Sequence, residues 1–485
     1  MRSKFKIVQL FLLLFLLENL HALRPTAVAG SFYTNNKPEL QREVNTLLRD
    51  AKTFPKQNIN ALIVPHAGYV FSANVASTAY KTLNKKYKNI FLIGSSHYTS
   101  FDGASVYNIG DYKTPLGNVQ VNRSIASKLI KDSKYFVFRA EAHEKEHTLE
   151  VQLPFLQTIY GDDLKIVPII IATSNLQTII SISKTLSPYF NDDNLFIIST
   201  DLSHYPTFRD ANIVDKNILD SLVKNSPKKF VEALAKNEDA KIEALQTSAC
   251  GWTSLLTLLY MTQDKAYKYE TLEYKNSAHS KYGDKKRVVG YGAMRVYKSD
   301  EFFLTVKEKQ ELLKIAKESL YEAIINKKRH VIDESKVSAK LREPLGAFVT
   351  LHKENRLRGC IGTFEPDKPL YKVIVDMTIA SALNDERFKE VTPDELKNID
   401  IEVSVLTPRK KISSLDEIVI GKHGIYIKKD SKTGTYLPHV ATQMKWNVKE
   451  FVGNCSNEKV GIGFDGYKDA ELFIYEAIVF DKKGL

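Results

Sequence analysis

Cysteine is scarce in this sequence, and its scarcity excludes one class of protein. Only 3 of the 485 residues are cysteine, and Cys250, Cys360 and Cys455 lie far apart in the chain. An odd, widely spaced set of thiols does not form the disulfide framework of a small secreted domain. Each thiol therefore needs its own explanation, which is burial, metal ligation or chemical reactivity.

The sequence also lacks internal repeats, low-complexity segments and, after its first two dozen residues, any run long enough for a transmembrane helix. Its 43% hydrophobic and 26% charged residues are typical of a globular protein. A chain of 485 residues is too long for one ordinary domain. We therefore expect two or three domains, each with its own core.

The chain has little concentrated charge, although its formal net charge is +12. Runs such as Lys85-Lys86 and Lys285-Lys286-Arg287 are short and have acidic residues between them. This spread predicts a solvated basic surface with some attraction for anionic partners. It does not indicate a dedicated nucleic-acid site.

The N-terminus has the pattern of a leader. Arg2, Lys4 and Lys6 precede an apolar run from Ile7 to Leu17. A basic segment before an apolar run of this length is typical of a signal peptide. Residues 1–22 are predicted to be a signal peptide cleaved near Ala22 or a membrane leader, which gives an exported or membrane-tethered protein. The alternative is an upstream extension on a cytoplasmic protein.

The first half of the chain alternates short apolar runs with helical segments. The runs are uninterrupted rather than alternating, which is typical of parallel strands buried on both faces. They cover residues 61–64, 90–93, 164–172, 195–198 and 288–296, with helices expected at 73–86 and 211–236. The predicted class for residues 23–297 is α/β, with a mainly parallel central sheet.

The second half has a different pattern. After a linker at 298–304, Thr305–Glu308 is a capping box that opens a helix to about residue 325. Two hairpins and a further strand are expected at residues 345–351 with 357–364, 425–428 with 434–437, and 399–406. Because the strands form hairpins and the helices lie in separate segments of the chain, the sequence predicts an α+β domain over 302–485.

Three histidines follow strands of the first domain. His66, His97 and His204 each come within a few residues of a predicted strand end. Ligands of open α/β sheets bind beyond the carboxyl ends of the strands. The three imidazoles are therefore expected to converge, although any one of them alone would more often be structural.

Cys250 is a further candidate, because it precedes an apolar helical run and a helix N-terminus favours a thiolate. Its alternative is a small buried residue at a helix start. Two imidazoles and a thiolate suit iron, copper or zinc rather than magnesium or calcium. Asp201 and His204 are then expected to orient a ligand and to act as general acid or base.

A competing motif runs from His143 to His147, which matches the H-E-x-x-H pattern of zinc peptidases. The segment is intensely charged and offers no apolar face for a buried zinc helix. A charged helix start explains it better, and a zinc hydrolase is kept as a remote alternative.

Six ordered motifs resemble the Memo family over about residues 23–297. They are Leu23–Tyr33, Pro65–Tyr69, Gly94–His97, Glu146–Glu150, Ser199–His204 and Ala249–Gly251. The resemblance implies a fold similar to class III extradiol dioxygenases, with His66, His97 and Cys250 as the metal-binding trio. It implies that Asp201, His204 and His147 are polar residues around the metal, and that His143 is not part of the site. A cysteine in place of a carboxylate argues against ordinary ring cleavage.

The second domain resembles the AMMECR-type family. The octamer Leu357–Phe364 carries the resemblance, together with Leu345–Val349, Asp385–Phe388, Leu437–Ala441 and Trp446. The resemblance implies an α+β fold with no settled activity. Cys360, Arg358 and Asp385 are site candidates, and a structural role for the octamer is the alternative.

The fusion of these two domains resembles proteins of the AmmeMemoRadiSam system, which implies a separate radical S-adenosylmethionine (SAM) enzyme as partner. The chain has no C-x3-C-x2-C cluster motif of its own. The leading hypothesis is a metal-dependent, redox or dioxygenase-like enzyme, most readily with iron. The alternative is a non-catalytic scaffold that binds a metal or a peptide.

Overall fold

The computed structural model describes residues 22–364 and 367–482, which fall into two compact units. We call residues 1–300 unit 1 and residues 301–485 unit 2. The predicted leader lies almost entirely outside the described residues. Within the described ranges, no helix combines the length and the apolar character needed to cross a membrane.

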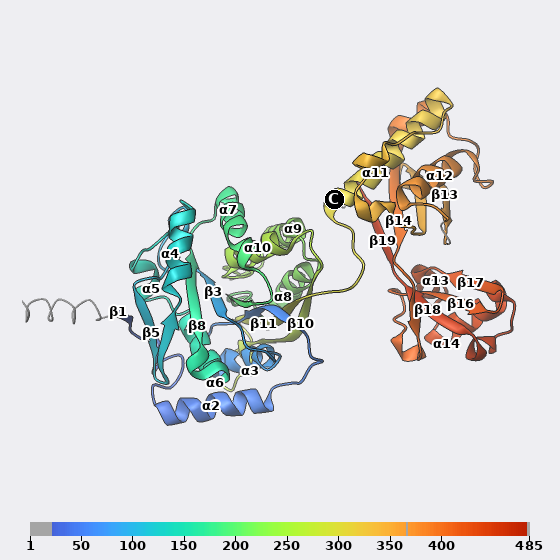
Figure 1. Cartoon of the computed structure of the whole chain (residues 1–485). Coiled ribbons are helices and arrows are strands. Elements are labelled where there is room, and N and C mark those ends of the chain that lie inside the picture. The colour runs from blue at the N-terminus through green and yellow to red at the C-terminus, as the bar shows by residue number, and fades with distance from the viewer. Residues whose placement is uncertain (1–21, 365–366, 483–485) are drawn as a thin grey trace, which may run out of the picture. The chain divides into compact units, whose positions relative to one another are not determined.

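Unit 1 is built on one large mixed sheet with the order β1-β5-β6-β8-β3-β9-β2-β11-β10, and β4 joins β8 to β7 (Figure 1). The central pairs β8–β3, β3–β9 and β9–β2 are parallel, as predicted. The strands are β1 (Ala22–Arg24), β2 (Ile59–Val64), β3 (Asn89–Ser95), β4 (Ala104–Val106), β5 (Gly110–Thr114), β6 (Gly117–Val121), β7 (Phe136–Val137), β8 (Lys165–Ile171), β9 (Asn194–Ser199), β10 (Tyr267–Asn276) and β11 (Gly290–Lys298).

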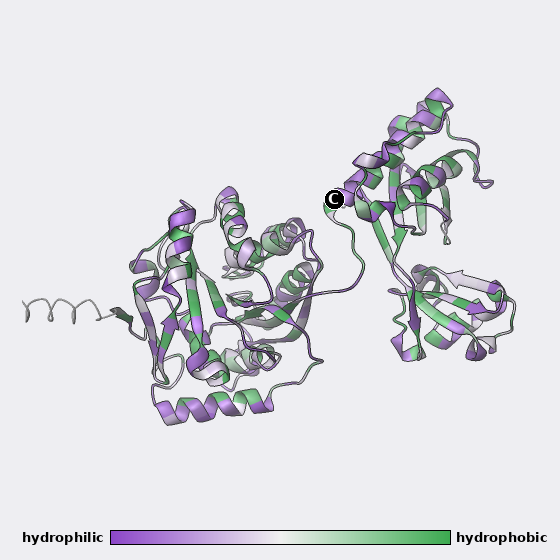
Figure 2. Cartoon of the chain, in the orientation of Figure 1, coloured by the Kyte–Doolittle hydropathy of each residue, from purple (hydrophilic) through white to green (hydrophobic). Residues whose placement is uncertain are grey.

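Helices cover both faces of this sheet. They are α2 (Lys37–Asp50), α3 (Tyr69–Tyr80), α4 (Arg123–Asp132), α5 (Glu141–Glu144), α6 (Leu153–Tyr160), α7 (Leu176–Leu186), α8 (Phe208–Val223), α9 (Pro227–Asp239) and α10 (Trp252–Thr262). Successive residues of one strand enter opposite cores: Ile90 and Leu92 pack with α2, α3 and α6, whereas Phe91 and Ile93 pack with α7 to α10. Burial on both faces is the physical reason for the uninterrupted apolar runs (Figure 2).

Two expectations for unit 1 were wrong in detail. The helix expected over 211–236 is two helices, because Ser226 caps a new helix whose first residue is Pro227. Strand β10 was not expected at all. Its sequence, from Tyr267 to Asn276, is rich in polar residues, and it pairs with β11 alone at the end of the sheet order.

Unit 2 contains two four-stranded antiparallel sheets with helices, which confirms the α+β class. Its helices are α11 (Val306–Tyr321), α12 (Leu370–Leu383), α13 (Pro438–Met444) and α14 (Val448–Asn454). Its strands are β12 (Ala347–Lys353), β13 (Arg356–Thr363), β14 (Ile399–Leu406), β15 (Lys410–Ile412), β16 (Gly424–Lys429), β17 (Lys432–Tyr436), β18 (Glu471–Tyr475) and β19 (Ala477–Asp481). The capping box at Thr305 is present.

Both predicted hairpins of unit 2 are present. The turn of the first uses Glu354 and Asn355 at φ values of 52° and 60°, as a tight two-residue turn requires. The sheets follow the orders β13-β12-β14-β19 and β15-β18-β16-β17. The chain crosses between the two sheets after β14 and again after β18. The two crossing segments are hydrogen-bonded to each other: Thr407 N donates to Glu476 O at 2.9 Å, and Glu476 N donates to Thr407 Oγ1 at 2.9 Å.

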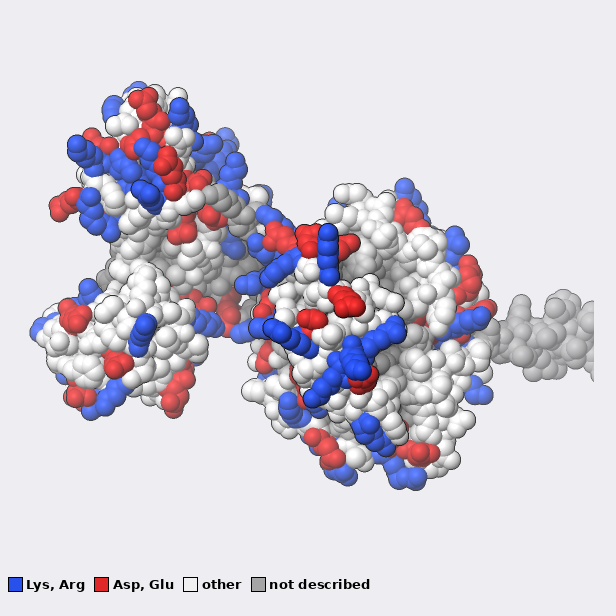
Figure 3. All heavy atoms as spheres, turned by 180° about the vertical axis from the view of Figure 1, so that it is seen from behind, with Lys and Arg blue, Asp and Glu red and all other residues white. Residues whose placement is uncertain are grey.

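The surface carries both signs of charge. On the face drawn in Figure 3, Lys and Arg side chains stand among Asp and Glu side chains in both units. Several of the cations are paired at close range, such as Lys216 with Asp220 at 2.7 Å and Lys468 with Asp465 at 2.9 Å. Exposed pairs of this kind contribute little to stability.

Candidate metal centre

Three imidazoles converge beyond the carboxyl ends of the central strands of unit 1. His66 follows β2, His97 follows β3, and His147 comes from the segment after α5. The ring centroids are 5.3 Å apart for His66 and His97, 5.4 Å for His66 and His147, and 5.0 Å for His97 and His147. One nitrogen from each ring lies within 4.8 Å of the others. The strand-end prediction therefore located His66 and His97 correctly, and the third imidazole of the cluster is His147 rather than His204.

Hydrogen bonds fix the orientation of two of these rings. His66 Nδ1 lies 3.0 Å from Ser199 Oγ, and His97 Nδ1 lies 3.1 Å from Glu146 Oε1. The other Glu146 oxygen accepts from His97 N at 2.8 Å. Metal-binding histidines are held through the ring nitrogen that does not face the ion. In both residues Nδ1 is engaged in this way, so Nε2 is the nitrogen that would face an ion.

The charges of the cluster follow from burial and from Glu146. Burial lowers the pKa of His66 well below its usual range, and it lowers that of His147 to about 4. Burial also opposes a charge on His97, but the hydrogen bond that its ring donates to the Glu146 carboxylate raises the pKa of His97. That bond lowers the pKa of Glu146 to about 2 against the effect of burial. Two neutral imidazoles and a carboxylate favour a cation.

Cys250 lies against the cluster, although it is not part of the group of three. Its Sγ is 3.2 Å from His66 Nε2 and accepts from Asp201 N at 3.2 Å. Gly251 allows the segment that carries Cys250 to lie close to Thr200, because a Cβ on residue 251 would lie 2.5 Å from Thr200 Cβ. Burial, followed by the charge of Asp201, raises the pKa of the Cys250 thiol. The expected effect of the helix N-terminus is therefore outweighed, and a thiolate needs a bound cation.

Asp201 and His204 supply the polar surroundings. Asp201 is 3% exposed, and its Oδ1 accepts from His66 N at 2.8 Å. Burial raises the pKa of Asp201 to about 7. It lowers the pKa of His204 to about 4. His204 Nε2 is buried and has no hydrogen-bond partner within the described part of the chain. These groups suit proton transfer, and their catalytic roles stay predictions.

The competing H-E-x-x-H motif has a structural explanation. Helix α5 ends at Glu144, so His143 and His147 do not share one face of a zinc helix. His143 is 1% exposed, its Nδ1 lies 3.0 Å from the hydroxyl of Tyr112, and its Nε2 lies 2.9 Å from Ser105 Oγ. Both ring nitrogens are engaged, and the zincin interpretation of this motif is wrong.

A buried ion pair supports the segment that carries Glu146 and His147. Arg24 is 2% exposed and pairs with Glu150, which is fully buried. Its guanidinium also donates to the carbonyl oxygens of His143 and Glu146. Glu150 in turn accepts from Ala27 N, Val28 N and the hydroxyl of Tyr33. Residues 24–33 thus hold the His147 segment in place.

Sequence reasoning missed Glu146, although it precedes His147 directly in the fourth of the six motifs. The signal that could have found it is the carboxylate of Glu146 directly beside the imidazole of His147 in the sequence. The donor set fits a metal ion: clustered nitrogens, two oriented rings, an adjacent thiol and one buried unpartnered imidazole nitrogen.

Two family models match this chain. A family model described as Memo-like protein matches residues 24–295, which is more than half of the chain. The chain belongs to the Memo family. A second family model, described as AMMECR1, matches residues 313–480. The two matches show that this Memo family member is a fusion, as the sequence motifs indicate.

Relatives of this Memo family member occur in archaea. The MEMO1 family protein Ta0237 of Thermoplasma acidophilum is 30% identical over 276 residues, covering 56% of this chain and 97% of that protein. The MEMO1 family protein TV1383 of Thermoplasma volcanium is 31% identical over 277 residues, covering 56% and 97%. The solved structure of uncharacterized protein PH0010 from Pyrococcus horikoshii is 29% identical and covers 37% of this chain and 93% of that chain, with a TM-score of 0.33.

In unit 2 the candidates Cys360 and Asp385 lie together. Cys360 N donates to Asp385 Oδ2 at 2.8 Å, and Thr350 Oγ1 donates to Cys360 Sγ at 3.2 Å. The hydrogen bonds from Arg387 hold the pKa of Asp385 far below its usual range. Arg387 also donates to the carbonyl of Cys360. These bonds brace the octamer against the segment after α12.

The third candidate, Arg358, faces a different partner. Its guanidinium bonds both oxygens of Glu395, at 3.1 and 2.9 Å, and the carbonyls of Lys389 and Glu390. All these contacts are internal to the unit. They favour the structural alternative for the octamer over a site that contains Arg358.

Proposed function

We propose that unit 1 binds a redox-active or divalent metal ion and is a metal-dependent, dioxygenase-like redox enzyme. Iron is the first expectation, and copper and zinc are the alternatives. The observation that carries the proposal is the convergence of nitrogens from His66, His97 and His147 within 4.8 Å. A bound ion would supply Lewis acidity and, with iron or copper, electron transfer.

The protein residues around the cluster are suited to proton transfer. Asp201 has its pKa at about 7 because it is buried, so both of its protonation states are populated near neutral pH. His204 stays neutral, and its buried Nε2 is available to a substrate. We assign Asp201 the role of acid or base and His204 the role of substrate contact.

The carboxylates of the site argue against ordinary ring cleavage. Glu146 is bound to His97, and Asp201 is bound to the backbone of His66. A facial triad of two histidines and a carboxylate would need one of them as a ligand. The proposal therefore takes its third donor from His147 or Cys250 and leaves the substrate, a small molecule or a peptide, open.

Metal analysis of the purified chain tests binding. We expect one ion per chain, a loss with His66→Ala, and no loss with the control His352→Gln in unit 2. His147→Ala and Cys250→Ser separate the two donor sets, and X-ray absorption detects a sulfur ligand at about 2.3 Å. If the chain retains no iron, copper or zinc, and the variants change nothing, the proposal is wrong.

Oxygen uptake tests catalysis separately. We expect the metal-loaded chain to consume oxygen with a reducing aromatic substrate such as a catechol, and Asp201→Asn to slow it without releasing the ion. Retained metal with no redox turnover over a broad substrate panel would favour the non-catalytic scaffold instead.

The partner is a further part of the proposal. We propose that the chain acts with a separate radical SAM enzyme, as its resemblance to proteins of the AmmeMemoRadiSam system implies. Co-purification of the two proteins from cells that express both is the expected result, and its absence under anaerobic conditions would contradict it.

A further inference from the structure

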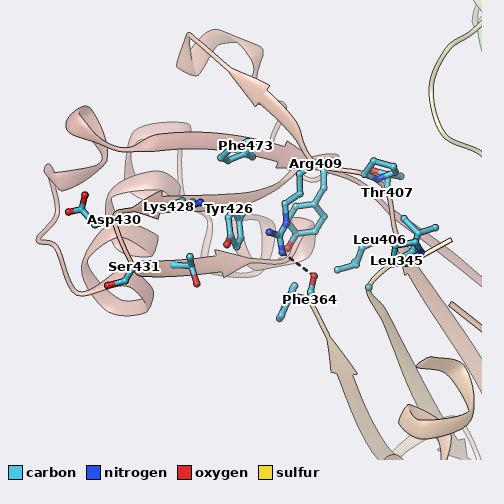
Figure 4. A pocket seen from close by; sticks show the side chains of 15 residues that line it. Leu345, Phe364, Leu406, Thr407, Arg409, Tyr426, Lys428, Asp430, Ser431 and Phe473 are labelled. Atoms are coloured by element: carbon cyan, nitrogen blue, oxygen red, sulfur yellow. Dashed lines mark hydrogen bonds between the residues drawn. The ribbon is translucent and has the colours of Figure 1, made fainter. Parts of the chain in front are cut away.

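Unit 2 contains a pocket at the place where the chain crosses between its two sheets. The cavity has a volume of about 650 Å³. Pockets for small ligands commonly have 300 to about 1,000 Å³. Leu345 comes from the segment before β12 and Leu406 from the end of β14, Arg409 comes from the crossing segment, and Tyr426 and Phe473 come from β16 and β18 of the second sheet (Figure 4).

The apolar part of the lining is aromatic. Tyr426 is 6% exposed, and its ring centroid lies 5.9 Å from that of Phe473. Tyr475 also lines the cavity, and its hydroxyl is engaged by the protein, since it donates to Tyr436 O at 3.1 Å and lies 2.8 Å from Thr435 Oγ1. Tyr475 therefore contributes apolar surface rather than a polar anchor. Aromatic walls of this kind favour a flat ring.

The charged part of the lining is mainly cationic. The Arg409 guanidinium carbon lies 3.5 Å from the centroid of the Tyr426 ring, and its Nη2 donates to Phe364 O at 3.0 Å. These two contacts fix the guanidinium beside the aromatic wall (Figure 4). Lys428 lies two residues after Tyr426 on β16, so it belongs to the same face of that strand. Among the lining residues that the structure describes, Asp430 is the one acid, and it is exposed in the turn.

We propose that this pocket binds a small anion that carries a planar aromatic ring, with a carboxylate or a phosphate as its charged group. The ring packs on Phe473 beside Tyr426, one face of which Arg409 covers, and the anionic group bonds to Arg409 and Lys428. A guanidinium suits both groups, because its fork of N–H donors matches two oxygens of either one. The site is in unit 2, so it is independent of the metal centre of unit 1.

Calorimetric titration of the full chain tests the ligand class with benzoate, phenyl phosphate, cyclohexanecarboxylate and inorganic phosphate. Benzoate against phenyl phosphate distinguishes the two charged groups. We expect the preferred aromatic anion to bind about three- to tenfold more tightly than its non-aromatic counterpart, from the usual strength of aromatic packing. The proposal is overturned if neither aromatic anion binds, or if inorganic phosphate binds as well as phenyl phosphate.

Variants test the position. Arg409→Gln should weaken the preferred probe about ten- to a hundredfold, as expected for a lost bond to a charged group. Lys468→Met removes a cation of unit 2 that does not line the pocket, and it should leave affinity unchanged. If Arg409→Gln does not fold, Lys428→Gln on the exposed end of β16 decides, with several-fold weaker binding expected. Unchanged affinity in the folded variant places the probe elsewhere and refutes the proposal.

Discussion

Replacing Arg24 tests whether residues 24–33 support the metal centre. Arg24→Met leaves the Glu150 carboxylate buried without its cation, and it removes donors from the carbonyls of His143 and Glu146. Breaking a buried pair in this way costs about 3–5 kcal/mol. Glu150 keeps the hydrogen bonds from Ala27 N, Val28 N and Tyr33, so we expect the lower end, about 3 kcal/mol.

Urea unfolding followed by tryptophan fluorescence measures this cost. The chain has 2 tryptophans, Trp252 in unit 1 and Trp446 in unit 2. In a Trp446→Phe background the signal reports unit 1 alone. Arg24→Met should shift the midpoint of the unit 1 transition to lower urea and weaken metal retention.

A double-mutant cycle with Glu150→Gln isolates the pair. The double variant should be less destabilised than the sum of the two single variants, because each single variant leaves one charge unpaired in the interior. Additive effects, or an Arg24→Met variant as stable as the parent, would refute the reasoning.

Three other predictions concern stability. Asp215 is fully buried, and burial raises its pKa from 3.8 to about 6. The folded state therefore holds its proton to higher pH than the unfolded state, and stability falls by about 3 kcal/mol in all as pH rises from about 3 to about 7. In Asp215→Asn the fall of stability with pH should become smaller in urea titrations at several pH values, leaving the part that the raised pKa of Asp201 contributes, and an unchanged pH profile would contradict the assignment. Gly251→Ala should destabilise unit 1 by about 1–3 kcal/mol through overpacking against Thr200 and should weaken metal retention, and a variant with the urea midpoint and metal content of the parent would contradict the tight contact. Arg358→Met should lower the stability of unit 2 by about 2 kcal/mol because Glu395 and two carbonyls lose their donors, as seen in the Trp446 signal, and a neutral effect would reopen a functional role for Arg358.

The sequence predicts the centre of unit 1 well because burial on two faces leaves a clear pattern. Runs such as 90–93 and 195–198 are uniformly apolar, and they are β3 and β9. The edge strand β10 escaped prediction because it pairs on one side alone, which leaves room for polar residues. Patterns of burial therefore identify central strands and miss peripheral ones.

The sequence could predict only those site residues whose position is determined by the end of a strand. His66 and His97 are placed by β2 and β3 themselves. The closeness of His147 depends on a long segment held by Arg24, and no local pattern shows that contact. The structural role of His143 likewise depends on Tyr112 and Ser105, which are more than 30 residues away in the chain. The ligand roles themselves stay predictions until metal is measured.

The connectivity of unit 2 has a consequence for how the protein is made. The second sheet, β15 to β18, is inserted between β14 and β19, which are neighbours in the first sheet. During synthesis, the first sheet cannot gain its edge strand until residues 477–481 have left the ribosome, which is after every strand of the second sheet. Until then β14 has an unpaired edge, which is an open template for another strand. The first sheet of unit 2 is therefore expected to be completed only after the second sheet has been made, whereas unit 1 can fold while unit 2 is still being synthesised.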